Sequence, residues 1–357
     1  MIKRFDALDA FRGLAALMVA IYHLKVIGVV SELTIVKNSS LFVEFFFVLS
    51  GFVIAYSYGD RIKSYKQFKD FSIKRFARVW PLHFFMMVLF IPFVIANLTL
   101  GIDLGERFSL YSFLSSFFLV QSFTMVSDSW NVTAWSISTE FYTYLIFGLL
   151  CLMPNFHRKP YTSILIVIVS FTFLSLKLDI NNSMFRCLAS FFLGNLAFRY
   201  YLSFKVKPWM EWASIILLIF TLSYYQGREL LFVMPFFFFV TVIVFAHESG
   251  VVSKALKMKY FQVLGVLSYS IYLTHAWFIS GIKAISIMSE KVINYKFINT
   301  IDGVRLIDFG FGFNDFIFIP FLLVVIGFSF FTHRFVELKA QKIINKAYLK
   351  KTPAYAL

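Results

Sequence analysis

The sequence contains few charged residues and almost no cysteine. Charged residues make up 15% of its 357 residues, against about a quarter in soluble domains. Its two cysteines, Cys151 and Cys187, both lie in apolar segments, where they form neither a disulfide framework nor a metal-binding spacing. The apolar stretch near the N-terminus lacks a small-residue cleavage site, so we expect it to be retained. The composition excludes an ordinary soluble domain, and we expect no metal site.

Long apolar runs take the place of charge. Hydrophobic residues make up 59% of the chain and aromatic residues 20%, and several runs approach the length of a transmembrane helix. The runs are continuous rather than alternating, which favours helices over membrane strands. We predict an all-α polytopic membrane protein, a single domain over 1–357, with about ten transmembrane helices. They cover roughly 7–27, 41–58, 79–98, 133–152, 161–178, 185–203, 209–225, 230–246, 261–281 and 316–333.

The basic residues predict the topology. A net charge of +15 would indicate nucleic-acid binding in a soluble protein. With a cytoplasmic N-terminus, however, 23 of the 34 Lys and Arg residues fall in inner segments and nine in outer segments. This asymmetry follows the positive-inside rule, so we expect both termini in the cytoplasm and no nucleic-acid partner.

Two outer connections stand out. Phe108–Val120 is apolar but too short to span, so we expect an interfacial or re-entrant helix there. The segment 283–315 mixes charges with three glycines and is expected to be an irregular lid.

The first predicted helix carries two ionisable residues, Arg12 and His23. They lie eleven residues apart, so they share one helix face and stand about 16 Å apart along its axis. Ionisable groups inside a membrane helix are costly and indicate a functional site. The alternative is that the two side chains snorkel to opposite membrane interfaces.

A second pair lies in the sequence KRFARVWPLH, in the inner loop before the third span. Arg75 and Arg78 are three residues apart, so one helical turn places both guanidinium groups on one side. They would either anchor the loop to lipid phosphates or form a fork for the phosphates of an anionic cytosolic cofactor. Pro81 is expected in the first turn of the new helix.

A carboxylate, Glu140, lies near the start of the fourth span in the sequence WSISTEFY. Because the first span runs outward and the fourth inward, we expect Glu140 at the depth of His23. The carboxylate would then fix the tautomer of the imidazole or support its protonated form. A structural hydrogen-bond cluster between helices is the alternative.

The ninth span has a polar stripe made of Ser268, Tyr272 and His275, which are four and three residues apart. Polar contacts between helices are the simplest role for such a stripe. Arg186, near the start of the sixth span, is expected to pair with Asp179 or to point into the same cavity.

Five motifs in one order resemble the acyltransferase-3 family of membrane O-acyltransferases. They read LDAFRGLAALMVAIYH, FFFVLSGF, RFARVWPLH, AWSISTEFY and LSYSIYLTH, and the resemblance covers essentially the whole chain. It implies that Arg12 and His23 are essential to activity, and it assigns functional roles to Arg75, Arg78 and Glu140. Larger members carry an appended extracytoplasmic hydrolase-like domain. This chain resembles the members without one.

The resemblance implies transfer of an acyl group, expected to be acetyl, from cytosolic acyl-CoA to a hydroxyl group of a cell-surface or exported polysaccharide or of a lipid-linked saccharide. The protein would lie in the bacterial cytoplasmic membrane. We expect Arg75 and Arg78 to bind the phosphates of the donor and Arg12 to stabilise its charge.

In this scheme His23, with Glu140, acts as general base or transient acyl carrier. Acceptor contacts are expected from Tyr142, Tyr272 and His275, and Ser138 and Tyr142 are the candidate oxyanion donors. A small-molecule acceptor such as a macrolide, a transporter or flippase that uses these residues as a proton relay, and a homo-oligomer remain open.

Overall fold

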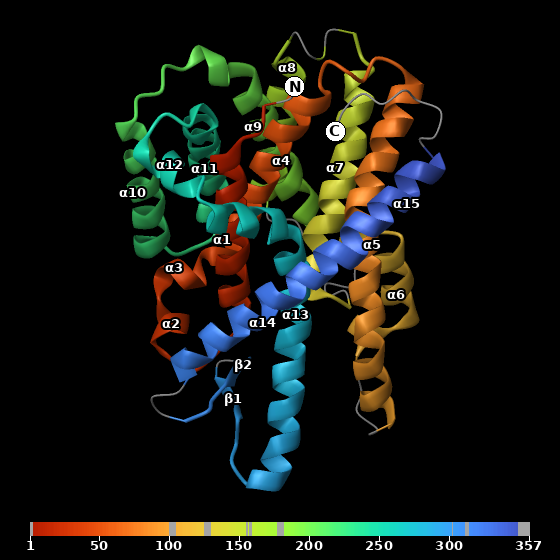
Figure 1. Ribbon diagram of the computed structural model, residues 1–357, viewed down its shortest axis with the longest axis vertical. Coiled ribbons are helices and arrows are strands. Elements are labelled where there is room, and N and C mark those ends of the chain that lie inside the picture. The colour runs from red at the N-terminus through yellow and green to blue at the C-terminus, as the bar shows by residue number, and fades with distance from the viewer. Residues whose placement is uncertain are drawn as a thin grey trace.

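A computed structural model describes residues 3–99, 105–124, 130–154, 156, 159–176, 182–301, 303–310 and 314–348. Within these ranges the chain is mostly helical, as predicted, with one short hairpin (Figure 1). The helices are α1 (Asp6–His23), α2 (Val29–Glu32), α3 (Thr34–Lys37), α4 (Phe42–Tyr58), α5 (Tyr65–Thr99), α6 (Leu110–Phe117), α7 (Trp135–Cys151), α8 (Tyr161–Ser175), α9 (Ser183–Tyr200), α10 (Trp209–Tyr224), α11 (Leu230–His247), α12 (Val251–Leu256), α13 (Lys259–Ile293), α14 (Phe318–Thr332) and α15 (Leu338–Tyr348).

Each of the ten predicted segments contains a helix: α1, α4, α5, α7 to α11, α13 and α14. Among the described residues, five stretches are long and apolar enough to cross a membrane. They are Ser39–Tyr58, Tyr65–Ala96, Leu230–His247, Lys259–Glu290 and Asn314–Tyr348. The other helices are shorter or more polar: α8, with 15 residues, is about 22 Å long. An all-α membrane protein is therefore supported, whereas the number of spans and the side of the termini stay predictions.

The centre of the fold is the contact between α1 and α13. In Figure 1, α13 continues downward past the end of α1 toward the strands at the lower end. The two helices meet at glycines, since a Cβ on Gly13 would lie 2.5 Å from the backbone carbon of Leu264, and a Cβ on Gly265 would collide with the Asp9 carbonyl. Small residues allow membrane helices to approach closely. The functional residues of α1 and α13 therefore face one another at short range.

A second close contact joins α4 to α9. A Cβ on Gly51 would overlap the Phe191 carbonyl, and a Cβ on Gly194 would overlap the Val48 carbonyl. Large phenylalanines, among them Phe47 and Phe191, are buried in the core beside this contact. The glycine next to Ser50 thus sets how deeply α4 lies in the bundle.

Two predicted boundaries are wrong. The third helix begins at Tyr65 rather than at residue 79, so Arg75 and Arg78 lie on a continuous helix and Pro81 lies inside it. Proline is tolerated within membrane helices because neighbouring groups satisfy the freed backbone. The predicted irregular lid is also more ordered than expected, because α13 continues to Ile293.

The rest of the lid forms an antiparallel hairpin, β1 (Ile298–Ile301) and β2 (Val304–Ile307). Backbone hydrogen bonds join Ile307 to Lys25 and Ile27, at 3.0 and 2.9 Å, so the hairpin holds the segment that follows α1. As expected, the segment from Phe108 to Val120 does not form a span. Its helix α6 has eight residues, about 12 Å, and it lies beside α5 in Figure 1.

Candidate active site

Arg12 on α1 is bound to the neighbouring helix α13. Its Nε donates to Ser268 Oγ at 2.8 Å, and its Nη2 donates to the Gly265 carbonyl at 2.9 Å. Asp9, one turn earlier on α1, lies 3.4 Å from Nη2. The guanidinium is therefore held at the contact between α1 and α13.

Arg75 on α5 lies between two tyrosines. Its Nη2 donates to Tyr58 Oη at 3.1 Å, and the guanidinium carbon lies 5.1 Å and 6.0 Å from the ring centres of Tyr58 and Tyr144. Its Nε is buried and has no hydrogen-bond partner among the described residues. A buried donor without an acceptor costs free energy, so this arginine is suited to bind an anion.

Arg78 is paired with Glu337, which the sequence analysis did not single out. Arg78 Nη1 lies 2.8 Å from Glu337 Oε2, and the glutamate side chain is fully buried. The other carboxylate oxygen accepts from Ser270 Oγ. Glu337 belongs to a π-helical turn, His333–Glu337, between α14 and α15, and such turns are frequent at functional sites.

Glu140 on α7 accepts hydrogen bonds from Ser50 Oγ on α4 and, at 2.6 Å, from Tyr144 Oη one turn further along α7. The two hydroxyl groups are 3.1 Å apart. Glu140 lines the same cavity as Arg12 and Arg75. The carboxylate is thus held by hydroxyl groups and faces cations.

These groups converge on one cavity with a volume of about 150 Å³. Three of its lining residues are arginines and one is a carboxylate, which makes the net charge of the lining positive when all four are ionised. A cavity of this size is smaller than the sites of drug-sized ligands. A cationic cavity of this size suits a small anionic group rather than a whole large ligand. The polar residues that line it are Arg12, Ser50, Arg75, Arg78, Ser136, Glu140, Tyr144, Ser268, Tyr269 and Tyr272.

His23, at the end of α1, contacts a second histidine. His275 Nε2 lies 3.3 Å from His23 Nδ1, and the ring centres are 5.1 Å apart. His23 is partly exposed, whereas His275 is fully buried. The predicted stripe on α13 therefore includes a contact with His23.

The predicted pair of His23 and Glu140 is wrong, because each has another partner in the structure. Glu140 lines the arginine cavity instead, where Ser50 and Tyr144 bond it. The segment before α7 packs against the start of this helix, since Ser138 Oγ donates to the Leu119 carbonyl at 2.5 Å and Gln121 donates to the Ala134 carbonyl at 3.0 Å.

The other predicted site residues differ in their positions. Tyr272 lines the cavity, donates to the Thr133 carbonyl at 3.0 Å and lies 2.8 Å from Ser136 Oγ. Its ring centre is 6.0 Å from that of His275, so it stands between the cavity and the histidines. Tyr142 and Ser138 are not among the residues that line the cavity, and both hydroxyl groups contact backbone carbonyls before α7.

Arg186 has a partner that the sequence analysis did not name. Its Nη2 lies 2.5 Å from Glu44 Oε1 on α4, and Glu44 is 1% exposed. Asp179, the predicted partner, lies outside the described residues. The Glu44 pair joins α9 to α4 and is not part of the cavity lining.

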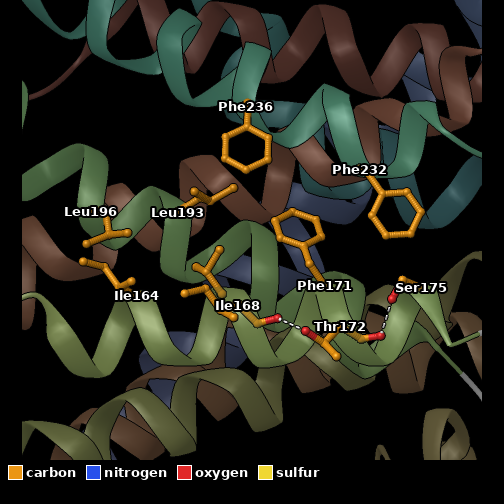
Figure 2. Close-up of a pocket in the computed structure, with 10 residues that line it drawn as sticks. Ile164, Ile168, Phe171, Thr172, Ser175, Leu193, Leu196, Phe232 and Phe236 are labelled. Carbon is orange, nitrogen blue, oxygen red and sulfur yellow. Dashed lines mark hydrogen bonds between the residues drawn. The ribbon is translucent and has the colours of Figure 1, made fainter.

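A larger cavity lies elsewhere in the fold. It has a volume of about 600 Å³ and is lined by apolar side chains of α8, α9 and α11, with Thr172 and Ser175 as the polar exceptions (Figure 2). The two hydroxyl groups bond within α8, to the carbonyls of Ile168 and Thr172. A cavity without ionisable groups offers no acid–base chemistry, so the arginine cavity and the histidine pair form the candidate site.

Sequence reasoning missed Ser50, Tyr144 and Glu337 as members of the site. Ser50 lies beside Gly51 in the motif FFFVLSGF, and such small residues are typical of close helix packing rather than of a contact with a carboxylate. Glu337 follows the last apolar run among basic residues and carries no local signal. Tyr144 lies four residues after Glu140 on one helix, so helical spacing is the signal that could have predicted their contact.

Residues 5–333 match the acyltransferase domain of the acyltransferase-3 family. The chain is 35% identical over 101 residues to "Protein 2 in picA locus" of Rhizobium radiobacter, and the aligned region covers 28% of this chain and 51% of that protein. It is 32% identical over 162 residues to "Acyltransferase MdmB" of Streptomyces mycarofaciens, and the aligned region covers 42% of this chain and 39% of that protein.

The chain therefore spans about half or less of the length of these curated relatives. No solved structure matches it. The family match extends over nearly all the described helices and includes Arg12, His23, Arg75, Arg78, Glu140 and His275. The chain belongs to the acyltransferase-3 family.

Proposed function

We propose that the protein is a membrane O-acyltransferase of the bacterial cytoplasmic membrane. It would transfer an acyl group, in the simplest case acetyl, from cytosolic acyl-CoA to a hydroxyl group of an exported or cell-surface polysaccharide or of a lipid-linked saccharide. The observation that carries this proposal is the convergence of Arg12, Arg75 and Arg78 on one small cavity. Family membership supports the reaction class.

Arg75 is the best anion ligand of the three arginines. Arg78 is already paired with Glu337, and Arg12 is bound to Ser268 and Gly265. Arg75 contacts the Tyr58 hydroxyl and keeps a buried Nε–H for which the described residues offer no acceptor. Because the cavity is much smaller than coenzyme A, it would hold one anionic group of the donor, and the remainder would extend outside.

The reacting carbonyl would lie near His23. An extended arm such as pantetheine reaches on the order of 20 Å, comparable to the separation of about 16 Å between Arg12 and His23 along α1. The donor would extend past Tyr272, which lies between the cavity and the histidines.

The chemical step would use His23 as general base. The imidazole takes the proton of the acceptor hydroxyl while the oxygen attacks the thioester carbonyl carbon. The carbon–sulfur bond breaks, and the departing thiolate receives the proton from the imidazolium. In the alternative, His23 carries the acyl group transiently before the acceptor attacks it.

The test is transfer of a labelled acetyl group by the purified protein in detergent or nanodiscs, with acceptors drawn from surface saccharides and from small hydroxylated molecules. Arg75→Gln should weaken binding of acyl-CoA by about tenfold or more, since a charge-assisted contact is lost. Lys69→Gln is the matched control, because Lys69 is an exposed cation on the same helix.

His23→Ala should abolish transfer without reducing the amount of folded protein. If label remains in the donor with every acceptor, while the protein moves a solute across vesicles, a transporter is the correct reading. Equal effects of the Arg75 and Lys69 substitutions on donor affinity would show that Arg75 is only a topology anchor.

A further inference from the structure

The two histidines of the site share a contact that restricts where their protons lie. His23 Nδ1 lies 2.9 Å from the Val19 carbonyl, four residues earlier on α1. His275 Nδ1 lies 3.1 Å from the Ile271 carbonyl, four residues earlier on α13. Carbonyl oxygens only accept hydrogen bonds, so each Nδ1 must carry a proton.

A neutral imidazole carries one proton, so both Nε2 atoms then bear a lone pair. His275 Nε2 lies 3.3 Å from His23 Nδ1. The His23 Nδ1–H group therefore donates a bifurcated hydrogen bond, to the Val19 carbonyl and to His275 Nε2. The opposite arrangement, with the proton on His275 Nε2, would place an Nδ1 lone pair against each of the two carbonyls. One tautomer of the pair is therefore favoured by three contacts at once.

We propose that His275 is a positioning residue that fixes His23 as the Nδ1–H tautomer, so that His23 Nε2 is the basic nitrogen offered to the acceptor hydroxyl. This inference rests on the proposed function for its catalytic meaning, but the tautomer itself does not. None of the described residues hydrogen-bonds His23 Nε2.

His275 itself is unsuited to touch a substrate. It is fully buried, and both of its ring nitrogens are engaged by the protein. The close contact of α1 with α13 at Gly13 and Gly265 holds the two rings in register. His275 would also continue to accept from His23 when the base becomes an imidazolium, which has an N–H group on both nitrogens.

The first test needs no substrate. ¹⁵N-histidine NMR of the purified protein, with His23 assigned by its substitution, distinguishes a protonated ring nitrogen from a bare one. We expect a protonated Nδ1 and a bare Nε2 on His23 in the wild type. A proton on His23 Nε2 in the neutral protein would overturn the proposal, whatever the acyl acceptor proves to be.

The second test uses substitutions of His275. His275→Leu removes the nitrogen that accepts from His23. We expect kcat to fall 10- to 100-fold, as for loss of a group that orients a functional histidine. The KM for acyl-CoA should stay unchanged. Gln retains an acceptor oxygen and should restore most of the lost kcat. His275→Leu with wild-type kcat, or His275→Gln no better than His275→Leu, would contradict the proposal.

His247→Leu is the matched control. His247 Nδ1 contacts the Ile243 carbonyl at 3.0 Å in the same local pattern, but His23 is not its partner. Its substitution should leave kcat within about twofold. Equal losses of kcat in the His247 and His275 variants would assign the effect to the bond between Nδ1 and the carbonyl four residues earlier, and would overturn the proposal. If His23 has the expected tautomer but no acyl transfer is found with any acceptor, the proposed function fails and only the tautomer assignment stands.

Discussion

Replacing Glu337 with Gln tests the ion pair that joins the C-terminal turn to the arginine cavity. The carboxylate is fully buried, accepts from Arg78 at 2.8 Å and also bonds Ser270. Breaking a buried pair costs about 3 to 5 kcal/mol, but about a third of the Arg78 side chain is exposed (31%), so water recovers part of that. We expect a loss of about 2 kcal/mol in the free energy of unfolding and a melting midpoint lower by about 2 to 4 °C.

The assay is a double-mutant cycle with Arg78→Gln, followed by thermal unfolding in detergent. A coupling free energy of about 2 kcal/mol is expected. The exposed pair of Lys37 and Glu32 is the control, and Glu32→Gln should change stability by less than about 0.5 kcal/mol. A coupling below about 0.5 kcal/mol for Arg78 and Glu337 would refute the reasoning.

The same variant has a consequence for donor binding. With Gln at residue 337, the charge of Arg78 is no longer balanced, so the cavity becomes more positive. Binding of acyl-CoA, measured by calorimetry, should tighten by up to about tenfold. Weaker binding in a protein of unchanged stability would mean that Glu337 aims Arg78 at the donor rather than restraining it.

Three further substitutions test the helix contacts. Gly265→Leu should drive α1 and α13 apart, at a cost of about 1 to 3 kcal/mol for overpacking, seen as a lower melting midpoint; an unchanged midpoint would contradict the packing argument. Ser268→Ala removes the hydroxyl that accepts from Arg12, so the KM for acyl-CoA should rise several-fold while the His23 tautomer stays the same; a changed tautomer would show that the two ends are not separable. Glu44→Gln breaks the buried pair with Arg186 and should cost about 3 kcal/mol in unfolding assays without altering donor affinity; a weaker donor affinity would place that pair in the site.

Sequence patterns located the helices well because a long continuous apolar run is itself the signal of a membrane helix. Each predicted span contains a helix, and the pairs Arg75 with Arg78 and Tyr272 with His275 fall on single helices, as spacing predicted. Contacts within a helix follow from 3.6 residues per turn. Arg12 was recognised for the same reason, as a charge in an apolar helix.

The spacing of residues along the sequence did not predict which side chains of different helices contact each other. His23 contacts His275 on α13, whereas Glu140 on α7 bonds Ser50 and Tyr144, and these pairings depend on how the helices pack together. Glu337 entered the site through a π-helical turn, which displaces later residues around the helix axis and leaves no signature in an apolar pattern. Continuation of the third helix back to Tyr65 was hidden because that extension is polar and lies outside the apolar run.

The length of α13 has a mechanical consequence. It is one continuous helix from Lys259 to Ile293, about 52 Å long, and its contacts with Arg12 and with His23 are made by Gly265 and His275, less than three turns apart. A rigid rotation of about 10° would move side-chain ends on a helix of this diameter by about 1 Å. Displacements of that size cost about 100-fold in catalysis. A movement of α13 would then change the geometry of the Arg12 contact and of the His23 contact at the same time. The C-terminal part of the same helix contacts the hairpin.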